Sequence, residues 1–206
     1  KLDRLNSKQM VSANDPAIAH LLPPTPTLWV GRDKPGAGGE IVKKNARVVA
    51  NDQKKNGRLD PNQCNSPVVT GVSAACTDAM ACIRGWHYRG GDVPGAYLQG
   101  QQLKSEQMLL RAPVGFREYD EDGNEVFWLM QHPLYGQSDA GAIWNRTINE
   151  FITTELGYER STHDPGLYTK VVDEATDARC ALPLYVDDLR VYYSESARAV
   201  AEADMK

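Results

Sequence analysis

The sequence predicts an α+β fold, in which helices are interleaved among short and mostly antiparallel strands. Short apolar or alternating runs bounded by Gly, Pro and Asp indicate the strands, and two longer segments repeat apolar residues at helical spacing. Strands and helices do not alternate regularly, which argues against a doubly wound parallel sheet. With 206 residues, the chain is long enough to bury one sizeable core.

The first part of the chain divides into a polar stretch and a predicted hairpin. Residues 1–26 are polar and end in a proline-rich run, so we expect a tether or linker that stops before the fold begins. Residues 27–32 and 40–50 are the two predicted strands, separated by a glycine-rich turn. The return strand carries three cations, which are Lys43, Lys44 and Arg47.

Two helices are predicted from apolar spacing and end signals. The first begins at Ser66, where Pro67 follows the capping serine, and ends near Gly85. The residues at helical spacing in it are Val68, Val69, Val72, Ala75, Ala79, Met80 and Ile83. The second helix is capped by Ser138 or Asp139 and ends before a glycine at position 157.

The remaining strands are short and are bounded by turns. The predicted strands are 86–92, 107–111, 126–130, 166–172, 180–186 and 189–193. Acidic turns occupy 120–123 and 173–177, and a helix begins after residue 194.

Charge is distributed unevenly along the chain, although its net value is only −4. Residues 1–60 hold 11 Lys and Arg against 6 Asp and Glu, and the remainder holds 12 against 21. The net charge taken alone argues against a nucleic-acid partner, but a basic first part joined to an acidic remainder is an asymmetry that needs an explanation. No apolar run reaches the ~20 residues of a membrane helix. None of the four cysteines has C-x-x-C spacing, which argues against a zinc ribbon.

Three carboxylates mark the candidate site. Asp187 and Asp188 interrupt an apolar strand, and Asp92 ends another. Two carboxylates at ~4 Å repel by about 4 kcal/mol at an effective dielectric of 20, and a divalent cation is the usual compensation. Oxygen donors without His or Cys suit Mg²⁺ or Mn²⁺. The alternative is a polar hairpin turn with a separate strand-end cap, although the Gly common in such turns is absent.

The segment Tyr185-Val186-Asp187-Asp188 resembles the YVDD box of reverse transcriptases, and six further blocks resemble copia-type retrotransposon polymerases in the same order. These blocks are KNARVVA at 44–50, NSPVV at 65–69, DVPGAYLQG at 92–100, RAPVGF at 111–116, LYG at 134–136 with Trp144, and GY at 157–158 followed by SxxDPGLY at 161–168. The resemblance runs from about Trp29 to Tyr193.

The resemblance implies a right-hand polymerase over residues 27–206. Its fingers are expected at roughly 27–85, and palm and fingers are expected to interleave after that. It also implies that the palm sheet is antiparallel and that the primer grip, the thumb and RNase H are absent from this chain. The implied reaction is RNA-directed DNA synthesis by a domain of a retrotransposon polyprotein. The implied partners are an RNA or DNA template–primer, deoxynucleoside triphosphates, and the integrase and RNase H regions, without a membrane.

The resemblance also implies a role for each site residue. Asp92 and Asp187 are the expected principal Mg²⁺ ligands, with Asp188 as third carboxylate, Val93 in the same metal shell and Mn²⁺ as a substitute ion. Tyr97 is expected under the incoming sugar as a steric gate against a 2′-hydroxyl. Lys44 and Arg47 are expected on the triphosphate, and Tyr185 and Val186 near the primer–template.

Plainer interpretations stay open. Tyr97 could be a core residue, and Lys44 and Arg47 could form a solvated strand face. The alternative functions are a decayed or co-opted nucleic-acid-binding remnant without catalysis, and an unrelated metal-dependent phosphoryl-transfer enzyme. We expect weak or no activity from the isolated chain. By family analogy, we expect localisation in a cytoplasmic virus-like particle or in the nucleus.

Overall fold

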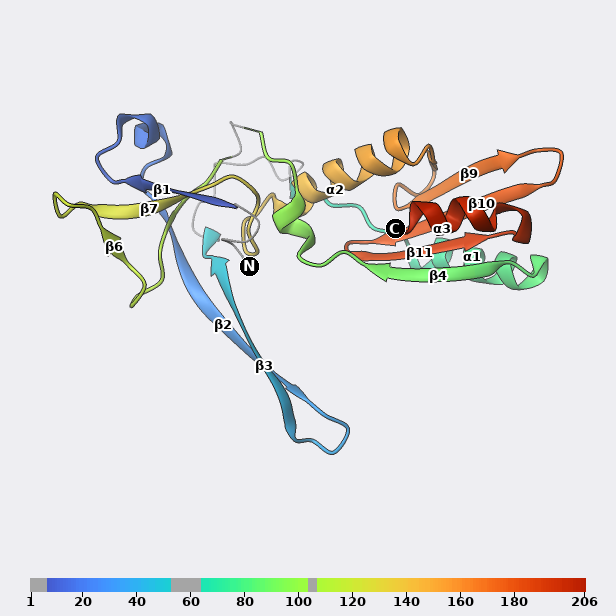
Figure 1. Cartoon of the computed structure of the whole chain (residues 1–206), viewed down its shortest axis with the longest axis horizontal. Coiled ribbons are helices and arrows are strands. Elements are labelled where there is room, and N and C mark those ends of the chain that lie inside the picture. Colours follow the sequence, from blue (N-terminus) through green and yellow to red (C-terminus); the bar gives the residue numbers. More distant parts are fainter. Residues whose placement is uncertain (1–6, 53–63, 104–106) are drawn as a thin grey trace. The chain divides into compact units, whose positions relative to one another are not determined.

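The structure is a computed structural model that describes residues 7–52, 64–103 and 107–206. Its chain divides into two compact units, each with its own sheet (Figure 1). The first unit comprises residues 1–64 and 97–143, and the second comprises 65–96 and 144–206. Both sheets have predominantly antiparallel pairing, and the described chain also contains helices, so the predicted α+β class is confirmed.

The first unit is built on a six-stranded sheet. Its members are β1 (Lys8–Ser12), β2 (Thr25–Pro35), β3 (Ile41–Ala50), β5 (Leu109–Arg111), β6 (Glu118–Tyr119) and β7 (Glu125–Met130). Their order is β1-β7-β5-β2-β3, with β6 also pairing with β7. The predicted hairpin is confirmed as β2 and β3, a long two-stranded ribbon drawn in blue in Figure 1.

The expected tether at 1–26 is wrong for its described part. Strand β1 pairs with β7, from Lys8 opposite Met130 to Ser12 opposite Val126. A 3₁₀ helix at Pro16–Leu21 then buries Ile18 and Leu21 in a cluster with residues of the sheet. A few apolar side chains in a polar stretch are enough to anchor this segment, because the sheet supplies the rest of the core.

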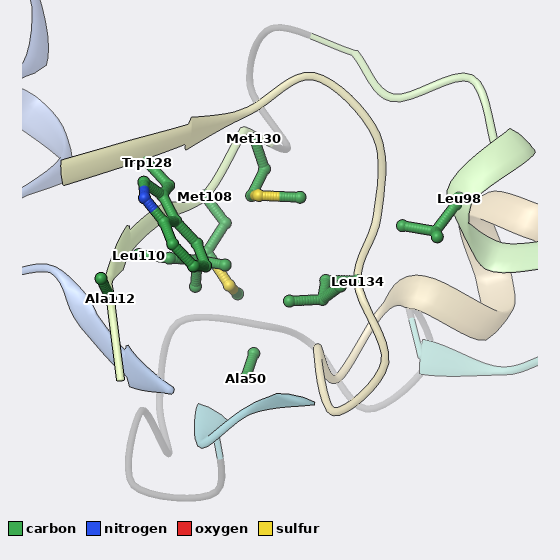
Figure 2. Packing of buried hydrophobic residues seen from close by; sticks show 8 residues of the cluster. All are labelled: Ala50, Leu98, Met108, Leu110, Ala112, Trp128, Met130 and Leu134. Atoms are coloured by element: carbon green, nitrogen blue, oxygen red, sulfur yellow. The ribbon is translucent and has the colours of Figure 1, made fainter. Parts of the chain in front are cut away.

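A hydrophobic core fills the first unit beside the sheet. Figure 2 shows the eight buried side chains, contributed by β3, β5, β7 and the segments near them. They are Ala50, Leu98, Met108, Leu110, Ala112, Trp128, Met130 and Leu134. Burial of these side chains in one cluster fixes the base of the ribbon, because Ala50 is the last residue of β3.

The second unit is built on a five-stranded antiparallel sheet in the order β4-β11-β10-β9-β8. Its strands are β4 (His87–Asp92), β8 (Glu159–Arg160), β9 (Leu167–Asp173), β10 (Ala178–Tyr185) and β11 (Asp188–Tyr193). The strand predictions at 86–92, 166–172, 180–186 and 189–193 are confirmed within two residues at each end. This agreement places both acidic segments of the sequence on neighbouring strands.

Helices lie against both faces of this sheet. Helix α1 (Gly71–Arg84) contacts it through Ala81, which packs with Ala181 and Tyr192. Helix α3 (Arg198–Asp204) lies by the other face and contacts β11. Helix α2 (Ala140–Glu150) continues into a π-helical turn at Phe151–Glu155, and Gly157 follows with a φ of 71°. Across the described ranges, no helix has the length and apolar character needed to cross a membrane.

Helix α1 begins later than predicted, at Gly71 with Thr70 as its N-cap. The preceding residues are extended instead, because the Val69 amide donates to the Leu184 carbonyl at 2.9 Å. The predicted apolar face of the helix is also wrong, since Val72 is 75% exposed and Ile83 is 86% exposed. The helix packs instead through small side chains, which allow it to approach the sheet closely.

Asp164 ties the start of α1 to the loop before β9. Its carboxylate accepts from the Thr70 hydroxyl at 2.8 Å and from the amides of Thr70 and Gly166 at 2.9 Å each. Burial disfavours the charge on Asp164, but these bonds and a hydrogen bond with Ser73 outweigh it and lower its pKa to about 2. Position 166 must be glycine, because a Cβ there would lie 2.0 Å from the Val69 nitrogen.

We expect Asp164→Asn to lower the free energy of unfolding by about 2 kcal/mol at pH 7, because a buried charged acceptor is lost. The folded pKa lies below the ordinary value, so this stabilisation is present above about pH 4 and is lost as the pH falls toward 2. The measurement is urea unfolding of both proteins from pH 7 to pH 2. The exposed Asp122→Asn is the control, and an equal loss at pH 7 and pH 2.5 would contradict the assignment.

Candidate active site

The three candidate carboxylates lie at one end of the second unit's sheet. Tyr185 pairs with Asp188, so Val186 and Asp187 form a two-residue loop between β10 and β11. Strand β11 pairs in turn with β4, which puts Asp188 directly opposite Asp92. The Val93 amide donates to the Asp187 carbonyl at 3.0 Å and continues this pairing beyond the strand ends. Asp92 and Asp188, which are 96 positions apart in sequence, thus meet at the hairpin.

Asp92 and Asp188 form a close cross-strand pair. Val93 and Asp187, the neighbouring pair along the two strands, are joined by a backbone hydrogen bond. Hydrogen-bonded and non-hydrogen-bonded pairs alternate in an antiparallel sheet, so Asp92 and Asp188 form a non-hydrogen-bonded pair, in which the side chains lie closer together. Directly opposite residues project from the same face of a sheet, so two carboxylates share one face here. Like charges in this arrangement destabilise a sheet. The Asp188 side chain is 54% exposed and lies 3.8 Å from the Arg190 guanidinium, which offsets part of the repulsion.

Asp187 occupies the loop rather than the strand pair. Across the described ranges, no group of three or more His, Cys, Asp or Glu side chains is placed to hold a metal ion. The structure therefore brings Asp92 and Asp188 together and holds Asp187 beside them through its backbone, without a finished three-carboxylate cage. The available donors are carboxylate oxygens on one edge, and this donor chemistry fits Mg²⁺ or Mn²⁺.

Val186 has a strained backbone at the centre of this loop. Its φ is 57°, a value that a β-branched residue rarely adopts and that costs of order 1–3 kcal/mol. Glycine is the usual residue where a two-residue hairpin loop needs a positive φ. The indole Nε1 of Trp144 donates to the Val186 carbonyl at 2.8 Å. The loop's two carbonyls are thus both bonded, one to Trp144 on α2 and one to Val93 after β4.

The residues expected at the nucleotide lie in the first unit, where two of them share a neighbour. The Arg47 guanidinium lies 5.0 Å from the centre of the Tyr135 ring, within the range of a cation–π interaction. The Tyr97 ring, on the 3₁₀ helix Ala96–Gln99, lies 4.9 Å from the same ring. Tyr97 is partly exposed, and Arg47 is exposed. Tyr135 therefore links the two predicted residues.

A close backbone contact fixes Tyr135 in this position. The Ala50 amide at the end of β3 donates to the Tyr135 carbonyl at 2.8 Å. Gly136 follows with a φ of 87°, and a Cβ there would lie 2.2 Å from the Ala50 carbonyl oxygen. Only glycine accommodates both the conformation and the contact. The Leu-Tyr-Gly segment thus docks an aromatic ring beside the strand that carries Arg47.

Lys44 and Arg47 do not share a face of the ribbon. They are three positions apart on β3, and regular alternation directs their side chains to opposite sides. Lys44 lies opposite Asp33, whereas Arg47 lies opposite Val30. Within these two fully described strands, the face of Arg47 carries four exposed cations and no carboxylate. We call these residues the basic face: Arg32, Lys34, Lys43 and Arg47.

The basic face contains a like-charged pair. Lys34 and Lys43 are direct cross-strand partners, and such pairs destabilise a ribbon in the absence of a counter-charge. A polyanion would supply that counter-charge. Lys43 was expected among the cations of the return strand, but Arg32 and Lys34 were not identified as part of this face. The alternation of side chains on either side of the turn would have placed all three on one face.

The structure thus divides the predicted residues between the units. Asp92, Val93 and the hairpin Tyr185–Asp188 belong to the second unit, and the nucleotide residues belong to the first. Tyr185 is 58% exposed, and Val186 is partly buried in the loop. Tyr135 and Trp144, which have contacts in the site, both belong to a block that carries the resemblance. Nothing in the sequence indicated which atoms they would contact.

Comparison with known proteins identifies the family. Residues 19–203 match the family of reverse transcriptases (RNA-dependent DNA polymerases). The chain is 26% identical over 178 residues to the retrovirus-related Pol polyprotein from transposon RE1 of Arabidopsis thaliana, which covers 83% of the chain. It is 26% identical over 173 residues, 82% of the chain, to the corresponding polyprotein from transposon RE2 of the same plant.

A further relative is the putative transposon Ty5-1 protein of Saccharomyces cerevisiae, 29% identical over 100 residues, which are 48% of the chain and 30% of that protein. The matches cover 12% and 11% of the two plant polyproteins, so the chain spans only a small part of their length. The family match and the transposon relatives confirm the resemblance to copia-type retrotransposon polymerases. The chain belongs to the reverse transcriptase (RNA-dependent DNA polymerase) family.

Proposed function

We propose that this chain carries the nucleotidyl-transfer site of a retrotransposon reverse transcriptase. The observation that supports this most directly is the Asp92–Asp188 pair at the tip of the β10–β11 hairpin. In this proposal the second unit, residues 65–96 and 144–206, corresponds to the palm, and the first unit, residues 1–64 and 97–143, corresponds to the fingers. The reaction is attack of a primer 3′-hydroxyl on the α-phosphate of a deoxynucleoside triphosphate, with pyrophosphate leaving.

The three carboxylates supply the oxygens for divalent ions. Asp92 and Asp188 present two carboxylates on one face, and the bonded loop presents Asp187 next to them. Bound Mg²⁺, or Mn²⁺ in its place, would lower the pKa of the primer hydroxyl and neutralise charge on the phosphate oxygens. Val93 contributes by fixing the Asp187 backbone through its amide. The exposure of the pair leaves room for ions and substrate.

The nucleotide residues act through charge and shape. The Arg47 guanidinium offers a planar fork of donors that matches phosphate oxygens. Lys44 lies on the opposite face of the same strand, so Arg47 is the better placed of the two predicted cations beside Tyr97 and Tyr135. Contact with the Tyr135 ring limits the freedom of Arg47 and of Tyr97. A held Tyr97 ring suits the proposed steric gate against a 2′-hydroxyl better than a mobile one would.

The basic face suits the phosphate backbone of the template strand. Arg32, Lys34 and Lys43 have no acidic neighbour on the same face of β2 or β3, so these three cations are available to a polyanion. Phosphate contacts of this kind supply affinity without sequence selectivity, which a polymerase that copies any template requires.

We expect Asp187→Asn to reduce Mg²⁺-dependent primer extension about a thousandfold, because a metal ligand contributes several kcal/mol to the transition state. The assay uses the polyprotein-derived enzyme that contains this chain, with an RNA template, a DNA primer and deoxynucleoside triphosphates. Asp122→Asn, in an exposed turn of the first unit, is the matched control and should extend normally. Unchanged extension by the Asp187→Asn enzyme would refute the role of this carboxylate.

We expect the double variant Lys34→Gln/Lys43→Gln to bind single-stranded nucleic acid with a weaker salt dependence. Removing two phosphate contacts should reduce the slope of log K against log salt by about 1.4, at about 0.7 for each contact. The measurement is fluorescence anisotropy with a labelled oligonucleotide at several salt concentrations. Lys206→Gln, at the other end of the chain, is the control, and an unchanged slope in the double variant would exclude the basic face as the binding surface.

Nucleic-acid binding without catalysis is the second candidate function. It is favoured by the missing three-carboxylate cluster in the described parts of the chain and by Arg190, a cation beside Asp188. Filter binding of template–primer without nucleotide incorporation, even in Mn²⁺ and with the polyprotein-derived enzyme, would support it. A salt slope near zero would count against both candidates.

A further inference from the structure

The β10–β11 loop holds a conformation that its own sequence disfavours. Val186 has a φ of 57° in a two-residue loop, and its β-branched side chain penalises this region of backbone space. Such a conformation persists only where surrounding contacts determine it. The contacts of the loop therefore control where Asp187 and Asp188 point.

A buried side chain contacts this loop. The Trp144 Nε1 donates to the Val186 carbonyl at 2.8 Å, and Trp144 itself is only 4% exposed. This bond orients the peptide group between Val186 and Asp187. The orientation of that peptide group in turn sets the direction in which the Asp187 side chain leaves the backbone. Tryptophan suits this role, because its indole combines a large apolar ring with a single N–H donor.

Helix α2 gives Trp144 a fixed base within the second unit. Asn145 donates to the Pro67 carbonyl at 3.1 Å, and Asn149 accepts from the Tyr168 hydroxyl at 3.2 Å. Further along the same helix, Ile148 is 7% exposed. The indole therefore projects from an anchored helix rather than from a mobile segment.

We propose that Trp144 is a positioning residue, which holds the strained Val186 peptide so that the Asp187 and Asp188 carboxylates face their ligand together with Asp92. This inference rests on the proposed function, since it assigns a role toward the divalent ion of that site. The inference goes beyond the proposed function, because it makes catalysis depend on a buried indole that contacts neither metal nor substrate. Trp144→Phe should keep a buried aromatic ring at this position and remove only the indole N–H that donates to the Val186 carbonyl.

The test compares Mn²⁺ affinity of the full 206-residue chain, by calorimetry, in Trp144→Phe, Asp187→Asn and a matched control. The control is Trp128→Phe, because Trp128 is 6% exposed but its Nε1 has no hydrogen-bond partner among the residues that the structure describes. We expect Trp144→Phe to weaken Mn²⁺ binding about fivefold, the equivalent of one neutral hydrogen bond. Trp128→Phe should bind as the unsubstituted chain does.

A second variant separates positioning from general damage. Val186→Gly removes the backbone penalty, so Trp144→Phe should weaken Mn²⁺ binding less in that background than in the unsubstituted chain. In the polyprotein-derived enzyme, Trp144→Phe should lower kcat and leave KM for the nucleotide unchanged. Equal Mn²⁺ affinity in Trp144→Phe and Trp128→Phe would overturn the inference.

Two outcomes distinguish this inference from the proposed function. If Asp187→Asn weakens Mn²⁺ binding and Trp144→Phe does not, only the positioning role fails. If the unsubstituted chain and Asp187→Asn bind Mn²⁺ equally or not at all, the proposed metal site fails, and the inference fails with it. Hydrogen exchange of the Trp144 indole N–H needs no variant: slow exchange supports the bond, and exchange at the rate of a free indole overturns it.

Discussion

The pairing of β4 with β11 is the contact on which the candidate site depends. It places Asp92 opposite Asp188 and so sets two negative charges on one face of the sheet. That arrangement costs stability, and the exposed Arg190 offsets only part of the cost because exposed ion pairs contribute little. A ligand with positive charge would relieve this repulsion. The rest of the second unit holds this register against the repulsion.

Close backbone contacts at two glycines position the loops around the sites. Gly166 lets the segment before α1 lie against β10, where Val69 bonds to Leu184. Gly136 lets the Tyr135 loop dock on the end of β3. In both places a side chain would displace a backbone rather than a flexible group. The two units thus use the same device, a glycine at the point of closest approach, to bring two backbone segments together.

Strain and its restraint lie together at the hairpin. Val186 holds an unfavourable backbone angle, and its carbonyl is bonded to the buried Trp144. The adjacent Asp187 carbonyl is bonded to Val93. Because both bonds act on the backbone, neither of them uses the Asp187 carboxylate. The candidate site therefore combines a hydrogen-bonded main chain with charged side chains that are at least partly exposed.

The sequence by itself determined the α+β class, the strands around the three acids, and the family, because these depend on local periodicity and on ordered motifs. It misjudged residues 8–26 and the packing face of α1, since burial there depends on partners distant in the chain. Only the tertiary structure decided that Asp188 is the partner of Asp92, that Lys44 and Arg47 face apart, and that Trp144 bonds to Val186. Register and side-chain direction come from long-range pairing, which no local pattern encodes.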